Sequence, residues 1–255
     1  MFLRLPTVVL VYLGTVAFAQ PQPRATSFEV ASVRPSQHEV GPDYNNQIAY
    51  SPDGFNAKNV TLRRLIAEAW HCQTSQITGP PWLDRNEYDI AARVPEGTSR
   101  EQIQLMLRTL LNDRFQLKHH SENKQMRVYE LEIGKNGPHI KPDQAGNPPP
   151  SGPGFHFSGD MRQFADLLAL QFTMPAPENP GVPVKAGGPA IPVLDKTGLQ
   201  GNYSFSVALH PELGTDIFTA WKRALQDQLG LKIESKMDKV AVVSVDDAQK
   251  VPSSN

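Results

Sequence analysis

Asp195-Lys196-Thr197-Gly198 is the stretch of the sequence whose residue types most directly suggest chemistry. A carboxylate in such a setting can act as a nucleophile and form an aspartyl phosphate. That reaction also needs a nucleotide pocket and Mg²⁺-binding acids arranged around the aspartate. The rest of the sequence therefore decides whether Asp195 is a nucleophile or a turn residue.

The same tetrapeptide surrounds the phosphorylated aspartate of P-type ion pumps, but the remainder of the chain does not fit a pump. Leu199 follows Gly198 where a pump has a second threonine, and the sequence contains no Walker A loop. After the N-terminus, no segment is apolar enough to cross a bilayer. We therefore expect no phosphorylation of Asp195.

Turn chemistry accounts for the tetrapeptide better. Asp195 can accept hydrogen bonds from neighbouring amides, and Gly198 tolerates a positive φ. Two structural turn motifs are therefore predicted, each leading into a strand. Their residues are Asp195, Lys196, Thr197, Gly198, Gly201 and Tyr203 in the second half of the chain, and Trp82, Leu83, Asp84 and Tyr88 in the first half.

The seven histidines do not form a recognisable metal or catalytic motif. His-Glu-x-x-His is absent, and His71-Cys72 lacks a second pair of ligands. His119 and His120 are adjacent on a predicted strand, so their side chains should point to opposite faces. We predict no metal site and no cofactor.

Nucleophile motifs are equally absent. The sequence contains no Gly-x-Ser-x-Gly elbow. Acid pairs such as Asp84 with Asp89 lie in turns, where solvation explains them. Most aromatic residues follow helix or strand patterns and suggest core packing, with Trp82 in its Pro-Pro-Trp turn as the exception. No catalytic residue is predicted.

The N-terminus is typical of an export signal. Arg4 supplies a positive charge, Leu5–Val16 is apolar, and Ala17-Phe18-Ala19 is a small-x-small cleavage site. The apolar run is shorter than the roughly 20 residues of a spanning helix. We expect cleavage after Ala19 and a periplasmic or secreted protein.

The mature chain is expected to be soluble and nearly neutral. The full sequence has 25 Lys and Arg against 26 Asp and Glu, which gives no general electrostatic reason to bind nucleic acid. Cys72 is the single cysteine, so an internal disulfide is excluded. A chain of this size can build a core without one, and burial is the expected fate of Cys72.

Apolar periodicity predicts the elements of the first half. A strand is expected at 27–35, a helix at 59–70 capped by Asn59 or Thr61, and a strand at 88–94. A helix at 100–114 follows two overlapping capping boxes, Thr98-x-x-Glu101 and Ser99-x-x-Gln102. Strands at 115–120 and 126–133 are separated by polar residues, which suggests a hairpin.

The second half repeats much of this pattern. Helices are predicted at 160–172, with an Asp160-x-x-Gln163 box, and at 216–230, ending at Gly230. A strand is predicted at 203–209. Strands at 231–235 and 240–245 complete the half as a second hairpin.

The recurrence suggests an internal duplication. Leu111–Ser121 aligns without gaps on Leu225–Ser235, with five identical positions, and Leu83-Asp84 parallels Leu194-Asp195. The predicted fold class is α+β, with two αβ modules of helix, strand, helix and hairpin. The boundaries are 1–19 for the signal peptide, 27–140 for the first module, 141–154 for a Pro/Gly-rich linker, 155–247 for the second module with a Pro-rich insertion at 175–192, and 248–255 for a flexible tail.

We also predict that the two modules share one hydrophobic core, because each alone buries little surface. Seven apolar side chains from four helices are expected in it: Trp70, Leu107, Leu110, Phe164, Leu168, Trp221 and Leu225.

Eight segments together carry a resemblance to a known family: SFEVASVRP, NVTLRRLIAEAW, ITGPPWLDRNEYDIAARV, REQIQLMLRTLLNDRFQLKHH, VYELEIGKNGP, VLDKTGLQGNYSF, LQDQLGLKIES and AVVSVDDAQKVPSSN. The chain resembles an uncharacterised family of exported proteins, expanded in soil acidobacteria and described as a soil-associated domain of unknown function. The resemblance implies export and a bacterial source. Some relatives look fused behind a membrane metallopeptidase of the antibiotic-sensor type, which implies a sensing or partner-binding role.

Two further points qualify the resemblance. The family has no established catalytic residues that could be assigned here, and its members usually lack the insertion at 175–192. More weakly, each half is similar to the short periplasmic N-terminal modules of secretins and TonB-dependent transducers, which bind partners.

The sequence therefore favours a non-catalytic extracytoplasmic binding or sensing module. Its partner is expected to be a cell-envelope protein or an extracellular ligand. The alternative is a secreted hydrolase whose site is assembled from scattered acids and histidines. A cleft with converging acids or histidines would favour the hydrolase, whereas an open groove or strand edge would favour the binding module.

Overall fold

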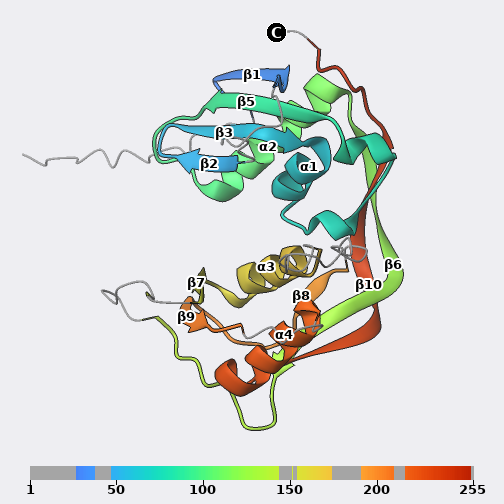
Figure 1. Ribbon diagram of the computed structural model, residues 1–255. Helices are drawn as coiled ribbons and strands as arrows, with labels where there is room; N and C mark the ends of the chain where they lie inside the picture. The colour runs from blue at the N-terminus through green and yellow to red at the C-terminus, as the bar shows by residue number, and fades with distance from the viewer. Residues whose placement is uncertain are drawn as a thin grey trace, which may run out of the picture.

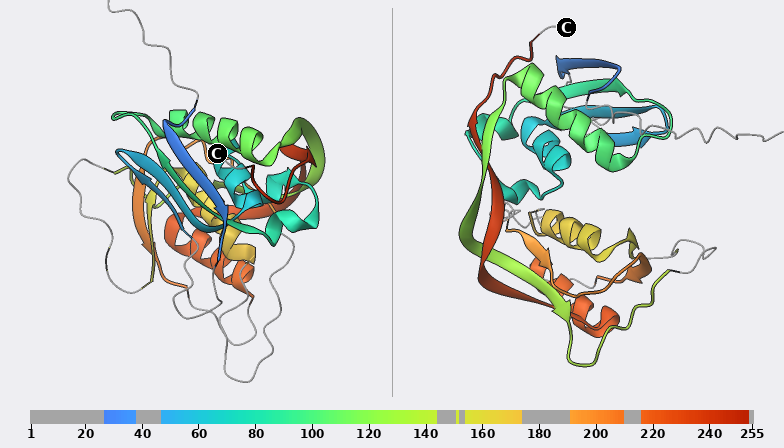
Figure 2. Two further views of the ribbon diagram at one scale, coloured as in Figure 1. Left: turned by 90° about the horizontal axis from the view of Figure 1, so that it is seen from above. Right: turned by 180° about the vertical axis from the view of Figure 1, so that it is seen from behind.

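Figure 1 shows the computed structural model, which describes residues 27–37, 47–143, 151, 154–173, 191–209 and 216–253. Two lobes lie on the same side of a long, curved ribbon made of two antiparallel strands, β6 (Lys118–Ile133) and β10 (Leu231–Asp247). The view from behind in Figure 2 shows the same arrangement. The fold contains helices and sheets and confirms the predicted α+β class.

The first lobe is a four-stranded antiparallel sheet packed with two helices. The strand order is β1-β5-β3-β2. The strands are β1 (Val30–Pro35), β2 (Gln47–Ser51), β3 (Gly54–Thr61) and β5 (Glu87–Arg93), and the helices are α1 (Leu62–Trp70) and α2 (Arg100–Phe115). Short 3₁₀ turns at Thr74–Gln76 and Pro81–Asp84 flank β4 (Ile77–Thr78), which leaves this sheet and joins the ribbon.

The second lobe is smaller. Strands β7 (Phe155–Gly159) and β9 (Tyr203–Val207) pair antiparallel, and α3 (Met161–Thr173) and α4 (Ile217–Ala224) pack with them. Helix α4 continues into a π-helical turn at Leu225–Leu229 and stops at Gly230, whose φ is 67°. The short strand β8 (Val193–Asp195) joins the ribbon parallel to β6.

The two predicted hairpins are wrong, because the segments that were expected to turn continue as strands. β6 and β10 pair along their whole length, with Lys118 opposite Asp247 and Ile133 opposite Leu231. The polar residues in the middle of each strand resemble a turn in composition. Neither strand contains Gly or Pro, the residues that most strongly favour a turn. Each long strand therefore pairs with the other half of the chain.

The predicted single core is also wrong. The structure has two separate clusters of buried residues, one in each lobe. Leu107 and Leu110 belong to the first, with Trp70 partly buried against it. The second contains the four other residues that we expected in a shared core: Phe164, Leu168, Trp221 and Leu225.

The ribbon nevertheless links the two cores. Val243 and Val245, near the end of β10, lie in the first core, whereas Ile233, near its start, lies in the second. β6 also reaches the second core, through Leu131. Each lobe is therefore completed by a strand that emerges from the other half of the sequence.

The order of elements is the same in the two halves. One half reads β3-α1-β4-β5-α2-β6 and the other β7-α3-β8-β9-α4-β10. β4 lies beside β10 with Ile77 opposite Val243, and β8 lies beside β6 with Val193 opposite Tyr129. This register matches Ile77 with Val193 and corrects the expected correspondence of Leu83-Asp84 with Leu194-Asp195. The duplication itself stays a prediction.

The helix caps largely follow the sequence signals. Thr61 caps α1, and Ser99 with Gln102 forms the capping box of α2, so Thr98 with Glu101 does not. At α3, Asp160 accepts from the Gln163 amide at 2.8 Å. Strands β2, β3, β4 and β7 were not predicted. The signal peptide and most of the linker and insertion lie outside the described residues.

The C-terminal segment, expected to be flexible, is tied to the first lobe as far as Ser253. The Gln249 amide donates to the Phe115 carbonyl at 2.7 Å, and the Ser253 amide donates to the Arg114 carbonyl at 2.8 Å. Tyr88 donates its hydroxyl hydrogen to the Lys250 carbonyl at 2.7 Å. These contacts hold the end of β10 against α2.

Candidate functional site

The candidate site is a cleft between the two lobes with a volume of about 920 Å³. Its first wall is the C-terminal end of α1, the loop after it and the start of α2, and its second wall is α3. The side chains that bear on its chemistry are Glu68, His71, Cys72, Gln73 and Arg100 from the first lobe and Asp166 from the second.

The end of α1 sends three consecutive residues towards the cleft. His71 adopts a left-handed conformation, with φ 52° and ψ 54°, and terminates the helix. The His71 and Cys72 amides then donate to the Glu68 and Ala67 carbonyls, at 3.3 and 3.0 Å. Such a cap satisfies the last carbonyls of a helix and reverses the chain direction. His71, Cys72 and Gln73 consequently line the cleft.

Polar contacts connect the lobes at the base of this loop. The Gln73 side-chain amide donates to Asp166 at 2.8 Å and to the Val193 carbonyl at 2.6 Å. The Gln73 side-chain oxygen accepts from the Val193 amide at 2.9 Å. In addition, Arg162 of α3 donates to the His71 carbonyl. We call the contacts of Gln73 and Arg162 the interlobe latch.

Partial burial shifts the pKa values of three ionisable groups that line the cleft. It raises the pKa of Asp166, although the hydrogen bond from Gln73 opposes this. Burial also raises the pKa of the Cys72 thiol to about 11 and lowers the pKa of His71, as does the neighbouring Arg162. At neutral pH the cleft therefore presents a thiol and a neutral imidazole, and a protonated thiol is a weak nucleophile.

Glu68 and Arg100, which line the cleft, bind each other and Tyr50. Tyr50 donates its hydroxyl hydrogen to Glu68 at 2.5 Å, and Arg100 donates to Glu68 at 2.9 Å. The Arg100 guanidinium also lies 4.6 Å from the centre of the Tyr50 ring. Burial opposes ionisation of Glu68, but the hydrogen bonds from Tyr50 and Arg100 keep the pKa of Glu68 below its usual range. This cluster joins β2, α1 and α2.

The tetrapeptide Asp195-Lys196-Thr197-Gly198 lies in a tight turn after β8. The Asp195 carboxylate accepts from the Thr197 amide at 2.9 Å and from the Thr197 hydroxyl at 2.7 Å. The Thr197 hydroxyl oxygen accepts in turn from the Leu199 amide at 3.2 Å. Gly198 and Gly201 have positive φ of 69° and 85°, where glycine is favoured. The structural role of Asp195 remains a prediction.

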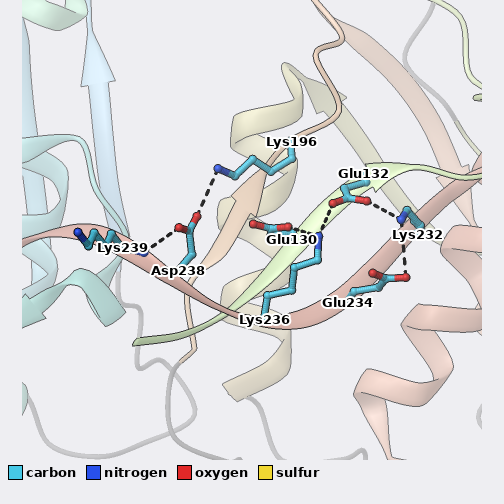
Figure 3. Close-up of polar contacts among 8 residues, drawn as sticks. All are labelled: Glu130, Glu132, Lys196, Lys232, Glu234, Lys236, Asp238 and Lys239. Carbon is cyan, nitrogen blue, oxygen red and sulfur yellow. Dashed lines mark hydrogen bonds and ion pairs between the residues drawn. The ribbon is translucent and has the colours of Figure 1, made fainter. Parts of the chain in front are cut away.

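Lys196 leaves this turn and reaches a ladder of charges on the face of the ribbon away from the second core (Figure 3). It lies 3.4 Å from Asp238. Further along, Lys236 pairs with Glu130 and, at 2.7 Å, with Glu132. The hydrogen bonds from Lys232 and Lys236 lower the pKa of Glu132 to about 2. Exposed pairs of this kind add little stability, and these opposite charges satisfy one another.

The first turn motif is packed differently. Leu83 is fully buried in the first core, and Trp82 is partly buried against it. Asp84 accepts from Arg63 at 2.5 Å. The buried Tyr88 is the second residue of β5 and bonds the Lys250 carbonyl, as described above. Of the residues in the two turn motifs, Asp84 lines the cleft. The structural role of both motifs stays a prediction.

His119 and His120 have different partners, as their adjacent positions on a strand require. The His119 ring packs against Trp70 with centres 4.5 Å apart, while His120 lies 2.9 Å from Asp246. Among the described residues, no three His, Cys, Asp or Glu side chains are grouped as a metal site would require. In the same part of the chain, every helix is too short or too polar to span a membrane.

The sequence had not identified Gln73 and Asp166 as site residues. They lie 93 positions apart and meet through the docking of α3 against the loop after α1. Neither Gln73 in its loop nor Asp166 on its helix belongs to a local sequence pattern that marks a functional residue. His71-Cys72 was considered because histidine and cysteine can bind metals. The left-handed cap at His71 lacks the glycine that usually marks such a helix end in a sequence.

Fold and site together define a two-lobed α+β protein with a polar cleft between lobes that share their long strands. The chain belongs to the family described as protein of unknown function DUF3738, whose sequence profile matches residues 63–248. That match covers the ribbon, the second lobe and the part of the first lobe from α1 onward, and it begins after β1, β2 and β3. Neither a curated protein nor a solved structure matches the chain significantly.

Proposed function

We propose that the protein is a non-catalytic extracytoplasmic binding or sensing module that holds a small polar ligand in the cleft between its lobes. The observation that carries the proposal is the cleft itself, a space of about 920 Å³ with walls from both lobes. Ligand sites are commonly concave and of this size, and they often lie where two units of a fold meet.

The lining also suits a polar ligand. Gln104 and Gln163 contribute amides to the walls, and Thr74 and Ser75 contribute hydroxyls. Among the described residues, the buried Ser75 hydroxyl oxygen has no hydrogen-bond partner. A buried polar atom without a partner is uncommon and calls for an explanation. That oxygen is closed to solvent, so a ligand in the cleft would bond it only after a small movement of the loop.

The chemistry of the cleft supports binding more than catalysis. An effective nucleophile requires an activated side chain, usually a thiolate or a hydroxyl beside a base. The pKa of the Cys72 thiol, at about 11, leaves little thiolate at neutral pH. Glu68 and Arg100 are held by each other and by Tyr50, so they form a structural unit.

A secreted hydrolase is the second candidate, because His71, Cys72 and Asp166 line the same cleft. The hydrolase alternative requires acids and histidines that meet in one cleft. The purified protein would be assayed against chromogenic esters, peptides and glycosides. Hydrolysis that is lost in both Cys72→Ala and His71→Ala, while the fold is retained, would establish the enzyme and reject the binding module.

The cellular location forms part of the proposal. An export signal at residues 1–19 implies a periplasmic or secreted protein that meets cell-envelope proteins or extracellular ligands. The family match and the resemblance of each half to partner-binding periplasmic modules are consistent with such a role. Mass spectrometry of native protein should find Gln20 at the N-terminus, and an intact Met1 would reject this location.

The binding proposal is tested by thermal shift with a panel of amino acids, short peptides, sugars and peptidoglycan fragments. A ligand at 100 times its dissociation constant adds about 2.7 kcal/mol to the stability. Leu170 of α3 lines the cleft and is 62% exposed, so Leu170→Arg should block a ligand without disturbing the core.

Leu105→Arg is the matched control, because Leu105 is 48% exposed on α2 and is not among the residues that line the cleft. The expected result is a thermal shift in the wild type and in Leu105→Arg that Leu170→Arg abolishes. A ligand whose effect survives in Leu170→Arg binds elsewhere. That result would contradict the proposed site.

A further inference from the structure

We propose that the two lobes open and close by bending the middle of the β6–β10 ribbon, and that the interlobe latch holds them at the angle seen in the structure. This motion goes beyond ligand binding and needs no ligand. It would widen or narrow the cleft, because Gln73 and Asp166 belong to its opposite walls.

The first support is the exposure of the ribbon between the lobes. At its ends, the inner face of β10 is covered by the cores, through Ile233 at one end and Val243 at the other. Halfway along, the same face carries Ser235 and Met237, and Met237 is 60% exposed. The matching part of β6 carries the exposed Gln125. In its middle, the inner face of the ribbon thus lacks a packed layer, although Val128, Val240 and Val242 are buried on the opposite face.

The second support is the pairing of the ribbon. β4 lies beside β10 at Val243 and Ser244, and β8 lies beside β6 at residues 129–131. Between these points the described residues form a two-stranded ribbon. Two paired strands without further neighbours are only marginally stable in water. Such a ribbon bends easily perpendicular to its surface, and the lobes lie on its concave side (Figure 2).

The third support is the separation of the cores. Each core has its own helices, so bending of the ribbon does not require apolar packing to be broken. Domain closure usually relies on such packed bodies joined by a few residues that absorb the change in backbone angles. The middle residues of β6 and β10 can take this role.

The latch supplies the restraint. Gln73 bonds the backbone of Val193 through both its amide hydrogen and its oxygen, and it also donates to Asp166. Arg162 adds its bond to the His71 carbonyl. These contacts lie on the concave side of the ribbon, where the lobes meet, so flattening the ribbon would stretch them first. Their removal should therefore release the lobes while each remains folded.

The experiment measures a distance between the lobes in the protein without ligand. Spin labels are placed on Glu96→Cys in the first lobe and Lys222→Cys in the second, in a Cys72→Ser background. Both positions are exposed. Pulsed electron spin resonance then gives the distance distribution for the latch-intact protein, for Gln73→Ala and for the double variant Gln73→Ala/Arg162→Ala.

Gln228→Ala is the matched control. Gln228 makes the same paired bond as Gln73, to the Ala208 amide at 2.9 Å and the Ala208 carbonyl at 2.8 Å, but within the second lobe. Gln73→Ala should add a population at longer distance, the double variant should enlarge it, and Gln228→Ala should leave the distribution unchanged. Identical distributions in all four proteins would overturn the proposal, and so would an equal shift in Gln228→Ala.

Hydrogen exchange on the wild type tests the hinge without any substitution. Amides at Gln125 and Met237 should exchange faster than amides at Leu131 and Val243, because local opening is easiest where packing is least. Equal protection along the whole ribbon would contradict a hinge in its middle. Both measurements are made without ligand. Their results can therefore reject the hinge without rejecting the binding proposal, and the thermal-shift test can reject the binding proposal without rejecting the hinge.

Discussion

The exchange of strands between the lobes predicts that a cavity in one lobe destabilises both. Leu225 is fully buried in the second core, and Leu225→Ala should cost about 2–5 kcal/mol. If the second lobe unfolds, the start of β10 and the end of β6 lose their support. The first lobe then loses the anchored strand that supplies Val243 and Val245 to its core. We therefore expect one cooperative transition.

The three tryptophans allow each lobe to be followed separately. Trp70 and Trp82 pack against the first core, and Trp221 lies in the second. A Trp221→Phe protein reports the first lobe, and a Trp70→Phe/Trp82→Phe protein reports the second. With a urea m-value of about 3 kcal/mol/M, a loss of about 2–5 kcal/mol lowers the midpoint by roughly 0.7–1.7 M. Both fluorescence signals should shift by the same amount.

Leu170→Ala provides the control, because Leu170 lies on α3 of the same lobe but is 62% exposed. It should leave both midpoints nearly unchanged, as surface substitutions usually do. The reasoning is refuted if Leu225→Ala lowers the midpoint of the second lobe while the signal from the first lobe does not move. The lobes would then be independent despite the shared ribbon.

Three further predictions concern single residues. Asp195→Asn should lower the free energy of unfolding in urea by about 0.5–2 kcal/mol, because the Asp195 carboxylate of the wild type accepts two hydrogen bonds from Thr197. Labelled ATP should leave the wild type unmodified, and a hydroxylamine-sensitive adduct would contradict the structural role of Asp195. Burial raises the pKa of the Cys72 thiol to about 11. Alkylation of Cys72 in the folded protein at pH 8 should therefore be on the order of a hundredfold slower than alkylation of a free thiol, and it should accelerate towards pH 11. An alkylation rate equal to that of the denatured protein would contradict the burial of Cys72. Burial raises the folded-state pKa of Asp166, so stability should fall as pH rises through that pKa. Asp166→Asn keeps an oxygen that can accept from Gln73 and should be more stable than the wild type near pH 7 but not near pH 3, as measured by melting curves.

The helices were predictable because their signals are local. Leu62, Leu65 and Ile66 repeat at helical spacing and are all fully buried, and Thr61 caps the helix that they begin. The Ser99–Gln102 capping box likewise marked the start of α2. Such signals depend on residues within one or two turns of each other.

The ribbon was not predictable in the same way. Residues 121–127 of β6 and 234–239 of β10 are mostly polar and none of them is buried, and a polar run in a sequence also signals a turn. Whether Ser121–Gln125 turns or continues depends on residues 239–243, which pair with it from the other end of the chain. The cleft depends on the same long-range arrangement, since Gln73 meets Asp166 only after α3 has docked.

The arrangement of the strands finally predicts what happens when the chain is cut between its two halves. β6 precedes the linker at 141–154 and β10 follows it, yet these strands pair over their full length. A protease site inserted between Asp143 and Ser151 would therefore separate two fragments that each lack one strand of the ribbon. In each fragment, the long strand would lose its partner and expose apolar residues such as Leu131 or Val243, which native packing covers.

The cut protein should consequently remain a single particle. Its two fragments should elute together in size-exclusion chromatography and melt together, at a lower temperature than the intact chain. Each fragment expressed alone should be unfolded or aggregated by circular dichroism and light scattering, because an unpaired strand is a template for association. Two fragments that elute apart, each with its own melting transition, would show that the ribbon does not unite the lobes. Because β6 and β10 lie on opposite sides of the cut and pair with each other, fragments that separate freely are incompatible with the structure.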